Sequence, residues 1–496
     1  MTALLDVLTA QPSYGSALRR LICELAIAGR LLPQTSTWAE HRLSAIVSVR
    51  GGSTPSMARP EYWGGDVPWV SPKDMHVGDI VTSEMFVTEE ALAKTNLELV
   101  PLGAVLIVGR SGILKRKLPA QVTRVSCTVN QDIKALTPKS AIESAYLRLW
   151  LLGSERAILA EDVKTGTTVQ SLVFAKLFAR SVKLPPTDEQ KRIVAKVDEL
   201  MALCDRLAAE QVSAAAAHAQ LVQALLASLS QARDAADFRA SWQQLAEHFH
   251  TLFTTEASID ALKQTVLRLG VWGKLVPQCQ AEQAATDFLK SVGIKAQEHE
   301  LPGWASVPLG SLGTVLGGAT PSKANPAFWS GDIPWVSPKD MKRALIADAE
   351  DHVSTEAVAG SALKLIPPSS ILMVVRGMIL AHSFPVAFTE KTVTINQDMK
   401  ALVPPADIAR YLLLFLQAAK LDMVALVDRS SHGTCKLISE KLWLFVVAVP
   451  PLAEQMRIVA KVDELMALCD QLKLNLTQAR QHHEHLASVL VEQAVA

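Results

Sequence analysis

Cysteine and long apolar runs are both scarce in this chain of 496 residues. The 6 cysteines include no CxxC pair, which argues against a zinc site and against a disulfide framework, so we expect reduced thiols. We find no run of about 18 uncharged apolar residues, which a membrane-spanning helix needs, and no signal peptide at the N-terminus. These absences predict a soluble, cytoplasmic protein with no membrane partner.

The chain also has no formal net charge at pH 7. Lys+Arg and Asp+Glu are balanced at 49 each, whereas a nucleic-acid-binding domain usually carries a basic excess. A local exception is the stretch 104–124, which has no acidic residue. Its basic residues are Arg110, Lys115, Arg116, Lys117 and Arg124. Two interpretations stay open for this stretch, a solvated loop and a loop that contacts phosphates.

Recognisable catalytic motifs are absent as well. The sequence has no GxGxxG or GxxxxGK[ST] phosphate loop, no GxSxG and no HExxH, and it lacks the Asn/Asp-Pro-Pro-aromatic tetrad of amino-methyltransferases. EQK at 189–191 has the spacing of a nuclease metal site, but the same segment recurs as EQM at 454–456, and a solvated helix turn is the favoured interpretation. The histidines of QHHEH at 481–485 are interpreted as a solvated helix end rather than a metal site. We therefore expect a chain without catalysis of its own.

What the chain does contain is one long repeat, written twice. GGSTPSMARPEYWGGDVPWVSPKDM (51–75) aligns without gaps to GGATPSKANPAFWSGDIPWVSPKDM (317–341). At the same offset VNQDIKAL (129–136) meets INQDMKAL (395–402), and Arg110 meets Arg376. Each copy closes on a nearly identical segment, EQKRIVAKVDELMALCD (189–205) or EQMRIVAKVDELMALCD (454–470). A similar leading segment precedes each copy, at 17–34 and at 261–278.

The repeat divides the chain into domains and helices. Short β-rich runs separated by Gly, Pro and Asn predict mixed α/β, strand-rich domains at 41–183 and 304–448. The other predicted parts are an N-terminal leading helix at 1–40, a long spacer helix at 184–232, a linker with a second leading helix at 233–303, and a second spacer helix at 449–496.

The closing segments place apolar residues at heptad spacing. Ile193, Val197, Leu200 and Cys204 step by 4, 3 and 4 residues, and Ile458, Val462, Leu465 and Cys469 repeat the pattern. Such a seam predicts coiled-coil helices, here of some 45 residues each. A seam needs a partner, and the nearest partner is its own copy. The predicted fold class is therefore α+β, with two strand-rich α/β domains separated by two long antiparallel coiled-coil helices in a pseudo-two-fold, cyclically repeated architecture.

In this combination the residues resemble a known family. The paired G-x-T-P…W…G-D-x-P-W-V-S-P-K-D-M blocks, the N-Q-D strands and the P-P-x-x-E-Q-x-x-I-V-x-K-V-D-E-L helices are similar to those of the DNA specificity subunit of type I restriction-modification systems. The ending G-K-L-V-P-Q of the second leading segment, at 273–278, also fits. The similarity covers nearly the whole chain, with both copies in order.

The resemblance implies a non-catalytic, double-stranded-DNA-binding subunit. Each α/β domain would be a target recognition domain for one half of an asymmetric bipartite site, and the helices would fix the spacer. The chain would bind no cofactor itself. Two modification (methyltransferase) subunits that use S-adenosylmethionine would dock on it, and two restriction subunits that use ATP and Mg can join them. Localisation would be the prokaryotic cytoplasm, on the nucleoid when DNA is bound.

Residue roles within the domains follow from the chemistry of DNA contact. Lys and Arg on phosphates set the register, while hydrogen bonds to base edges read the sequence. Glycine in the loops near 166 and 433 would let backbone N–H groups approach a phosphate. The candidate DNA-contacting residues are Lys73, Arg110, Lys115, Arg116, Lys117, Lys164, Thr165 and Thr167 in the first domain, and Lys339, Arg376, Ser431, His432 and Thr434 in the second.

Other repeated residues favour structural roles. The tryptophans Trp63, Trp69, Trp329 and Trp335 are interpreted as core anchors rather than base-stacking platforms, Asn130 and Asn396 as turn caps rather than adenine readers, and the Asp-Lys pair of SPKDM as a structural turn. The segments whose sequence differs between the copies, such as 76–100 and 342–366, would then recognise two different half-sites.

Two questions stay open at this point. The charged helix positions Arg192, Lys196, Asp198, Arg457, Lys461 and Asp463 are candidates for docking the methyltransferase subunits, with a merely solvated helix face as the alternative. A different class of function is a coiled-coil scaffold with two ligand- or peptide-binding heads and no DNA role, which the neutral net charge would suit.

Overall fold

The computed structural model describes residues 15–75, 78–164, 166, 169–232, 235–429 and 435–495. They form two compact units. Unit 1 comprises Met1–Ala216 with Gln481–Ala496, and unit 2 comprises Ala217–Arg480. Each unit holds one mixed α/β domain and part of both long helices, α8 (Thr187–Gln231) and α17 (Leu452–Val495).

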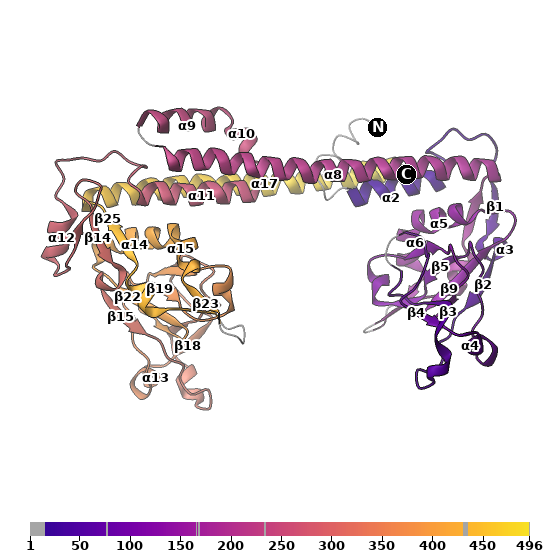
Figure 1. Ribbon diagram of the computed structural model, residues 1–496, viewed down its shortest axis with the longest axis horizontal. Helices are drawn as coiled ribbons and strands as arrows, with labels where there is room; N and C mark the ends of the chain where they lie inside the picture. The colour runs from indigo at the N-terminus through magenta and orange to yellow at the C-terminus, as the bar shows by residue number, and fades with distance from the viewer. Residues whose placement is uncertain are drawn as a thin grey trace. The chain divides into compact units, whose positions relative to one another are not determined.

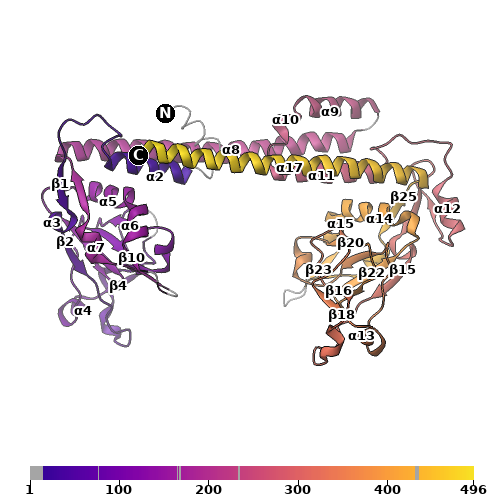
Figure 2. The same ribbon diagram turned by 180° about the vertical axis from the view of Figure 1, so that it is seen from behind.

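The elements of unit 1 follow one another as α2 (Gly15–Ile27), β1 (Ala39–Arg42), α3 (Leu43–Ile46), β2 (Val47–Gly51), η2 (Pro60–Tyr62), β3 (Trp63–Val70), β4 (Met85–Val87), α4 (Glu89–Lys94), β5 (Val105–Val108), β6 (Arg110–Ser111), η3 (Gly112–Lys115), β7 (Ala120–Val122), β8 (Thr128–Val129), β9 (Ile133–Pro138), α5 (Ser144–Gly153), α6 (Glu155–Glu161), β10 (Val163–Lys164), β11 (Gln170–Leu172), α7 (Phe174–Ala179) and β12 (Ser181–Leu184), and then the start of α8. Figure 2 shows α5 and α6 close to α2, with the strands beyond them.

The domain of unit 1 is built on a four-stranded antiparallel sheet in the order β2-β9-β5-β7. Its strand β5 is buried at every residue, because both faces of the sheet are covered. Val105 and Ile107 belong to the core shared with α5, whereas Leu106 and Val108 belong to a second core beneath the β3 layer. This alternation follows from the period of two in a strand, and it turns a continuous apolar run into two cores. The smaller sheets β4-β3-β8 and β10-β11-β6 extend the domain.

Unit 2 repeats this plan after the end of α8. Its elements are α9 (Ala235–Glu247), α10 (Phe249–Leu252), α11 (Glu256–Val271), α12 (Ala285–Ser291), β13 (Gln297–Glu298), β14 (Ala305–Pro308), η4 (Leu309–Ser311), β15 (Thr314–Gly317), η5 (Pro326–Trp329), β16 (Ile333–Val336), β17 (Leu345–Ile346), β18 (Asp351–Val353), α13 (Thr355–Gly360), β19 (Ile371–Val374), η6 (Met378–Ala381), β20 (Val386–Thr389), β21 (Thr394–Ile395), β22 (Met399–Val403), α14 (Ala406–Ala418), α15 (Lys420–Ala425), β23 (Val427–Arg429), β24 (Cys435–Leu437), α16 (Ser439–Trp443) and β25 (Val446–Val449), and then α17. The main sheet has the order β15-β22-β19-β20-β17, and β18-β16-β21 corresponds to β4-β3-β8. The predicted fold class of two mixed α/β domains with long helices is confirmed.

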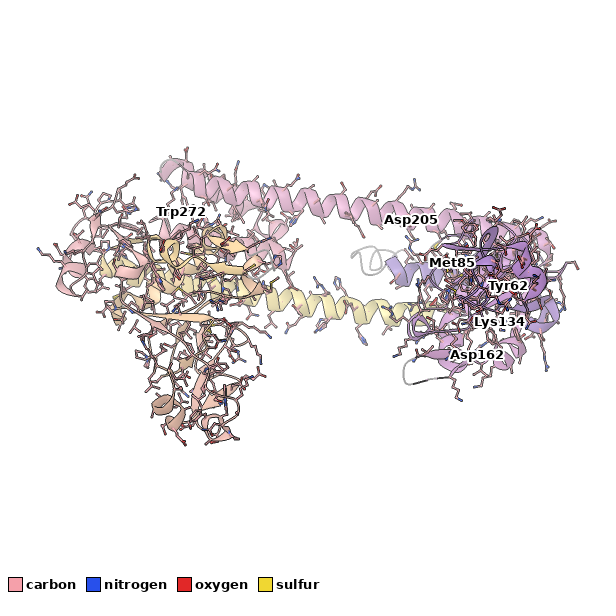
Figure 3. The ribbon with its side chains drawn as sticks, turned by 60° about the horizontal axis from the view of Figure 1, so that its bottom comes forward. Tyr62, Met85, Lys134, Asp162, Asp205 and Trp272 are labelled. Carbon is pink, nitrogen blue, oxygen red and sulfur yellow. The ribbon has the colours of Figure 1, made fainter. Side chains whose placement is uncertain are left out.

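Each leading helix packs along the start of the long helix of its own unit. In unit 1, Arg19 of α2 forms an ion pair with Asp205 of α8, which is labelled in Figure 3. In unit 2, Lys473 of α17 forms an ion pair with Asp260 of α11 at 2.6 Å, and α11 lies beside α17 in Figures 1 and 2. Higher numbers on α11 meet lower numbers on α17, since Lys263 pairs with Asp470, so these two helices run antiparallel.

The heptad seam is accordingly covered within each unit. Ile193, Val197 and Cys204 are buried in one cluster with residues of α2. The matching residues of α17, for example Ile458 and Val462, are buried in one cluster with residues of α11. A leading helix, which the sequence analysis did not consider as the seam's partner, therefore fills that role within each unit.

One described helix, α8, is long and apolar enough by length and composition to cross a membrane. The sequence scan did not single it out, because Gln, Ser and His interrupt its apolar residues. Val222, Leu226 and Leu229 near its end are buried in the core of unit 2. Its apolar character at this end is thus explained by packing.

Candidate nucleic-acid interface

The SPKD turn is held by the carboxylate of its aspartate. In unit 1, Asp74 accepts hydrogen bonds from the backbone N–H and hydroxyl of Ser71 at 2.7 and 2.9 Å, and from the N–H of Glu84 at 2.7 Å. Asp340 of unit 2 accepts the same set from Ser337 and Glu350. The predicted structural role of this aspartate is confirmed. The lysine between serine and aspartate, Lys73 or Lys339, is left exposed at the turn.

The NQD segment forms a second turn, which is also held by a side-chain oxygen that accepts a backbone N–H. The side-chain oxygen of Asn130 accepts the N–H of Asp132 at 3.1 Å, and that of Asn396 accepts the N–H of Asp398 at 3.0 Å. Both asparagines are buried, so the predicted turn-cap role is confirmed. The following glutamine is exposed in each copy, and Gln131 bonds to the exposed Thr54.

The tryptophans of the repeat pack in a small apolar cluster in each domain. Trp69 and Trp335 are each 7% exposed, and their ring N–H groups donate to backbone carbonyls at 3.0 Å. Trp63 stands edge-on to Trp69 with ring centres 5.2 Å apart, and Trp329 stands edge-on to Trp335 at 5.1 Å. Such edge-to-face pairs anchor a core. The prediction of core anchors is confirmed for Trp69 and Trp335, while Trp63 and Trp329 are partly buried and pack against the same clusters.

Two of the predicted DNA-contacting positions, Arg110 and Lys164, are linked by strand pairing through a third residue, Ser171. The N–H of Arg110 bonds to the carbonyl of Asp132 at 3.3 Å, so β6 begins beside the NQD turn. Arg110 then pairs with Ser171 in β11, and Ser171 pairs with Lys164 in β10. Directly paired residues in an antiparallel sheet point to the same face. Arg110, Ser171 and Lys164 thus form a row on one face, while the flanking Gln170 and Leu172 are buried.

Unit 2 builds the equivalent row from different residues. The N–H of Arg376 bonds to the carbonyl of Asp398 at 3.2 Å, and Arg376 pairs with Lys436, which pairs with Asp428 in β23. The neighbours of Lys436 in β24, Cys435 and Leu437, are buried. The row Arg376, Lys436 and Asp428 therefore faces solvent. The sequence analysis missed Lys436, Asp428 and Ser171, because strand pairing rather than any motif brings them beside the arginines.

The remaining predicted DNA-contacting residues do not belong to these two rows. Lys115, Arg116 and Lys117 are exposed at and after the end of η3. Arg116 and Lys117 line a cavity of about 700 Å³ whose wall is completed by α2, α5 and α8 of the same unit. They therefore lie toward the helices and not in the row formed by Arg110, Ser171 and Lys164. The predicted contacts Thr165, Thr167, Ser431, His432 and Thr434 lie outside the described residues.

The EQ pair that closes each domain is buried, which contradicts the interpretation of this segment as a solvated helix turn. Glu189 accepts hydrogen bonds from Thr35, Ser36 and the ring N–H of Trp38. Gln190 bonds to the carbonyls of Ala141 and Pro185. These contacts fasten the start of α8 to the domain. The recurrence of EQ three residues after a Pro-Pro step in both copies, PPTDEQ (185–190) and PPLAEQ (450–455), was the signal available in the sequence.

In unit 2 the same joint uses other partners. Glu454 is buried, and among the described residues it accepts only the ring N–H of Trp304, at 3.1 Å, while its second carboxylate oxygen has no partner there. Burial raises the pKa of Glu454. At Glu189 burial also acts to raise the pKa, but the hydrogen bonds from Thr35, Trp38 and Ser36 outweigh it and the pKa is lowered.

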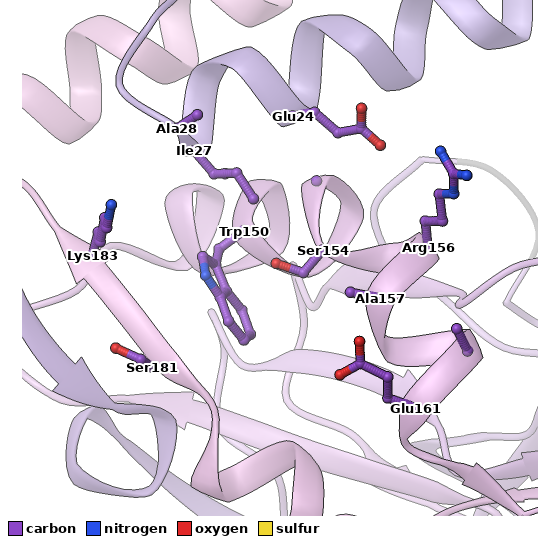
Figure 4. Close-up of a pocket in the computed structure, with 12 residues that line it drawn as sticks. Glu24, Ile27, Ala28, Trp150, Ser154, Arg156, Ala157, Glu161, Ser181 and Lys183 are labelled. Atoms are coloured by element: carbon purple, nitrogen blue, oxygen red, sulfur yellow. The ribbon is translucent and has the colours of Figure 1, made fainter. Parts of the chain in front are cut away.

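A further cavity, of about 660 Å³, also belongs to a joint between helix and domain. It lies between the end of α2, the helices α5 and α6, and β12, and Trp150 forms part of its wall (Figure 4). Burial raises the pKa of Glu24, which faces this cavity, and the nearby Arg20 and Arg156 lower it. The cavity lies beside the apolar contact between α2 and α5, which joins the leading helix to the domain.

The helix positions proposed for docking are divided between internal and exposed roles. Arg457 binds Glu282 and the carbonyl of Pro277 within unit 2, and Asp463 pairs with Arg410 at 3.1 Å. Lys196 and Lys461 pair with the glutamates Glu199 and Glu464 one turn along their own helices. Arg192 and Asp198 are exposed in unit 1.

Comparison with known proteins now places this architecture. A family model described as type I restriction modification DNA specificity domain matches residues 35–214 and 302–479. The chain belongs to this family. The specificity subunit of the type I restriction enzyme EcoAI from Escherichia coli is 29% identical over 369 residues, covering 68% of this chain and 62% of the relative. The EcoEI specificity subunit from Escherichia coli is 28% identical over 395 residues, covering 72% and 65%. The chain thus spans slightly less than two thirds of these relatives.

One further relative matches only part of this chain, and one solved structure resembles it at low sequence identity. The EcoR124I/EcoR124II specificity subunit from Escherichia coli is 39% identical over 166 residues, which is 33% of this chain and 41% of the relative. A chain in the solved structure described as "Structural basis underlying complex assembly and conformational transition of the type I R-M system" covers 94% of this chain and 99% of its own length, with a TM-score of 0.52 at 17% identity. At that identity the likeness concerns the fold.

Proposed function

We propose that this chain is the DNA specificity subunit of a type I restriction-modification complex. Each α/β domain reads one half of an asymmetric bipartite target, and the long helices set the distance between the halves. The observation that carries this proposal is the pair of equivalent exposed rows, Arg110–Ser171–Lys164 and Arg376–Lys436–Asp428. They occupy equivalent places on two copies of one scaffold and share an arginine, but their other two side chains differ.

Physical reasoning connects the shared and the divergent residues to two tasks. Exposed residues that recur in both copies, Lys73 with Lys339 and Arg110 with Arg376, are not needed for the core and suit phosphate contacts that set register. The residues that differ beside them suit base edges, since a reader of two different half-sites needs two different donor and acceptor patterns. Local basic rows of this kind supply phosphate contacts although the net charge of the chain is zero.

The partners follow from the same proposal. The chain is non-catalytic and acts with two methyltransferase subunits that bring S-adenosylmethionine, and with restriction subunits that use ATP and Mg. It works in the cytoplasm, on the nucleoid. The proposed docking positions are the exposed Arg192 and Asp198 with Lys196 in unit 1, and Lys461 in unit 2. Arg457 and Asp463 belong to the same proposed surface of unit 2, where Glu282 and Arg410 hold their side chains through ion pairs.

The test is to produce the full chain with the methyltransferase subunits encoded beside it and to map methylated adenines in the host DNA. The proposal expects one asymmetric motif of two short half-sites separated by a constant number of unspecified bases. Replacing residues 41–183 by the corresponding domain of another specificity subunit should change one half only. No methylation, together with no binding of the purified complex to DNA at low salt, would refute the proposal.

A further inference from the structure

The second domain exposes an apolar pair directly after its first basic residue. Met378 and Ile379 of η6 are 65% and 46% exposed, although side chains of this kind are usually buried. The gapless alignment of IVGRSGILK (107–115) with MVVRGMILA (373–381) puts Gly112 and Ile113 at the equivalent positions. Ile113 is only partly exposed and packs against the cores of unit 1. The exposed methionine is therefore peculiar to the second domain.

Backbone contacts fix this apolar pair beside the charged hairpin. The N–H of Gly377 donates to the carbonyl of Cys435 at 2.9 Å, and the guanidinium of Arg429 donates to the carbonyl of Ala381 at 3.2 Å. The helical turn η6 thus packs against both β23 and β24. Met378 and Ile379 consequently lie at the edge of the row formed by Arg376, Lys436 and Asp428.

This combination of chemistry suits a base edge better than a phosphate. An apolar side chain has nothing to bind on a phosphate, whereas the C5-methyl group of thymine is the apolar feature of the major groove. Lysine donates to O6 and N7 of guanine, and aspartate accepts from the N4 amine of cytosine, so Lys436 and Asp428 together fit one G·C pair. In the first domain the same positions carry Ser171 and Lys164, which do not offer this pattern.

Resting on the proposed function, we infer that Met378, Ile379, Lys436 and Asp428 form the specificity patch of the second domain. Met378 and Ile379 contact the methyl group of a thymine in the second half-site. Lys436 and Asp428 read an adjacent G·C pair. The cations Arg376 and Arg429 hold the phosphates on either side.

The decisive experiment removes single methyl groups from the DNA. The complex of the full chain with its methyltransferase subunits is bound to duplexes in which each thymine of the mapped target, on either strand, is replaced in turn by uracil. One replacement in the second half-site should weaken binding about fourfold, the value of burying one methyl-sized group. The Met378→Gly complex, which carries the residue of the first domain, should lose most of this uracil penalty, because only Ile379 is left to contact the methyl group. Lys436→Ser should lower discrimination at the neighbouring G·C pair at least about fivefold.

Controls separate this inference from folding and from the proposed function. Leu421→Ala removes a side chain that is 66% exposed on α15 of the same domain, and it should keep the full thymine preference. Continued recognition of the first half-site by Met378→Gly shows that the complex is assembled, and Met378→Ala serves as a second variant. A second half-site without thymine, or a Met378→Gly complex that keeps the uracil penalty, overturns the inference while the proposed function stands. A wild-type complex with no bipartite motif overturns the proposed function itself.

Discussion

Replacing Glu189 by glutamine should loosen the joint between α8 and the first domain. The carboxylate accepts the N–H and the hydroxyl of Thr35 at 3.4 and 3.0 Å, the hydroxyl of Ser36 at 3.2 Å and the ring N–H of Trp38 at 3.3 Å. A carboxamide can turn its oxygen to the two N–H donors and its NH₂ group to the two hydroxyls, which rotate to accept, so the contacts persist but lose the charge. A bond to a charged group, at about 1.5 kcal/mol, is about twice as strong as a neutral one, so each of the four bonds loses about 0.75 kcal/mol, or about 3 kcal/mol together.

Glu454→Gln is the matched control, because it makes the same change at the equivalent joint. Glu454 has one hydrogen-bond donor, Trp304, and its pKa is raised by burial. The fold therefore favours the neutral form, which glutamine imitates. We expect this variant to leave the joint of unit 2 unchanged or to stabilise it.

Hydrogen exchange followed by mass spectrometry localises the effect, which matters because two units need not unfold together. In Glu189→Gln, amides at 35–46 and 187–197 should exchange about a hundredfold faster, the equivalent of about 3 kcal/mol. Amides at 304–309 and 452–462 should be unaffected in that variant. Equal exchange in wild type and Glu189→Gln, or equal acceleration at both joints in their respective variants, would falsify the assignment of Glu189 as the brace.

The pH dependence of the two joints should have opposite signs. The pKa of Glu189 is lowered from 4.5, so its stabilising contribution is present above pH 4.5 and is lost as the pH falls through its folded-state pKa. The pKa of Glu454 is raised from 4.5, so its contribution is present below pH 4.5 and is lost as the pH rises through its folded-state pKa. Acidification from pH 7 should therefore speed exchange at the first joint relative to the second.

Three further predictions concern the turns, the DNA and the thiols. A Cβ at Gly52 would lie 1.9 Å from the carbonyl oxygen of Val129, and a Cβ at Gly318 would lie 1.9 Å from that of Asn396. Alanine at either position should therefore destabilise its domain by about 1–3 kcal/mol in thermal unfolding. Gly15→Ala should not, because its Cβ meets nothing within 4 Å. Arg110→Ala should reduce the slope of log affinity against log salt for DNA binding by about 1, and an unchanged slope would exclude a phosphate contact at this residue. Of the free cysteines only Cys279 is exposed, so Cys279→Ala should abolish the fast thiol reaction of the native protein at pH 8, while the denatured variant should still titrate its other cysteines.

The sequence by itself determined the repeat, and with it most of the architecture. Two copies with identical motif order demand two copies of one scaffold, and the heptad spacing demands long helices whose apolar seam is covered. The roles of Trp69, Asn130 and Asp74 could also be predicted, since each depends on residues within its own motif or on simple burial. Roles of this kind can be predicted because they depend on residues close by in the sequence.

Only the tertiary structure decided which distant residues meet. Lys436 becomes a candidate contact because strand pairing sets it beside Arg376, 60 positions earlier in the chain, and no local pattern records that register. Glu189 looked like a solvated helix residue because its partners lie more than 150 positions away, at Thr35 to Trp38. Spacing along one helix shows which side chains share a face. What covers that face is settled by the packing of the whole chain, since burial is a property of three-dimensional contacts.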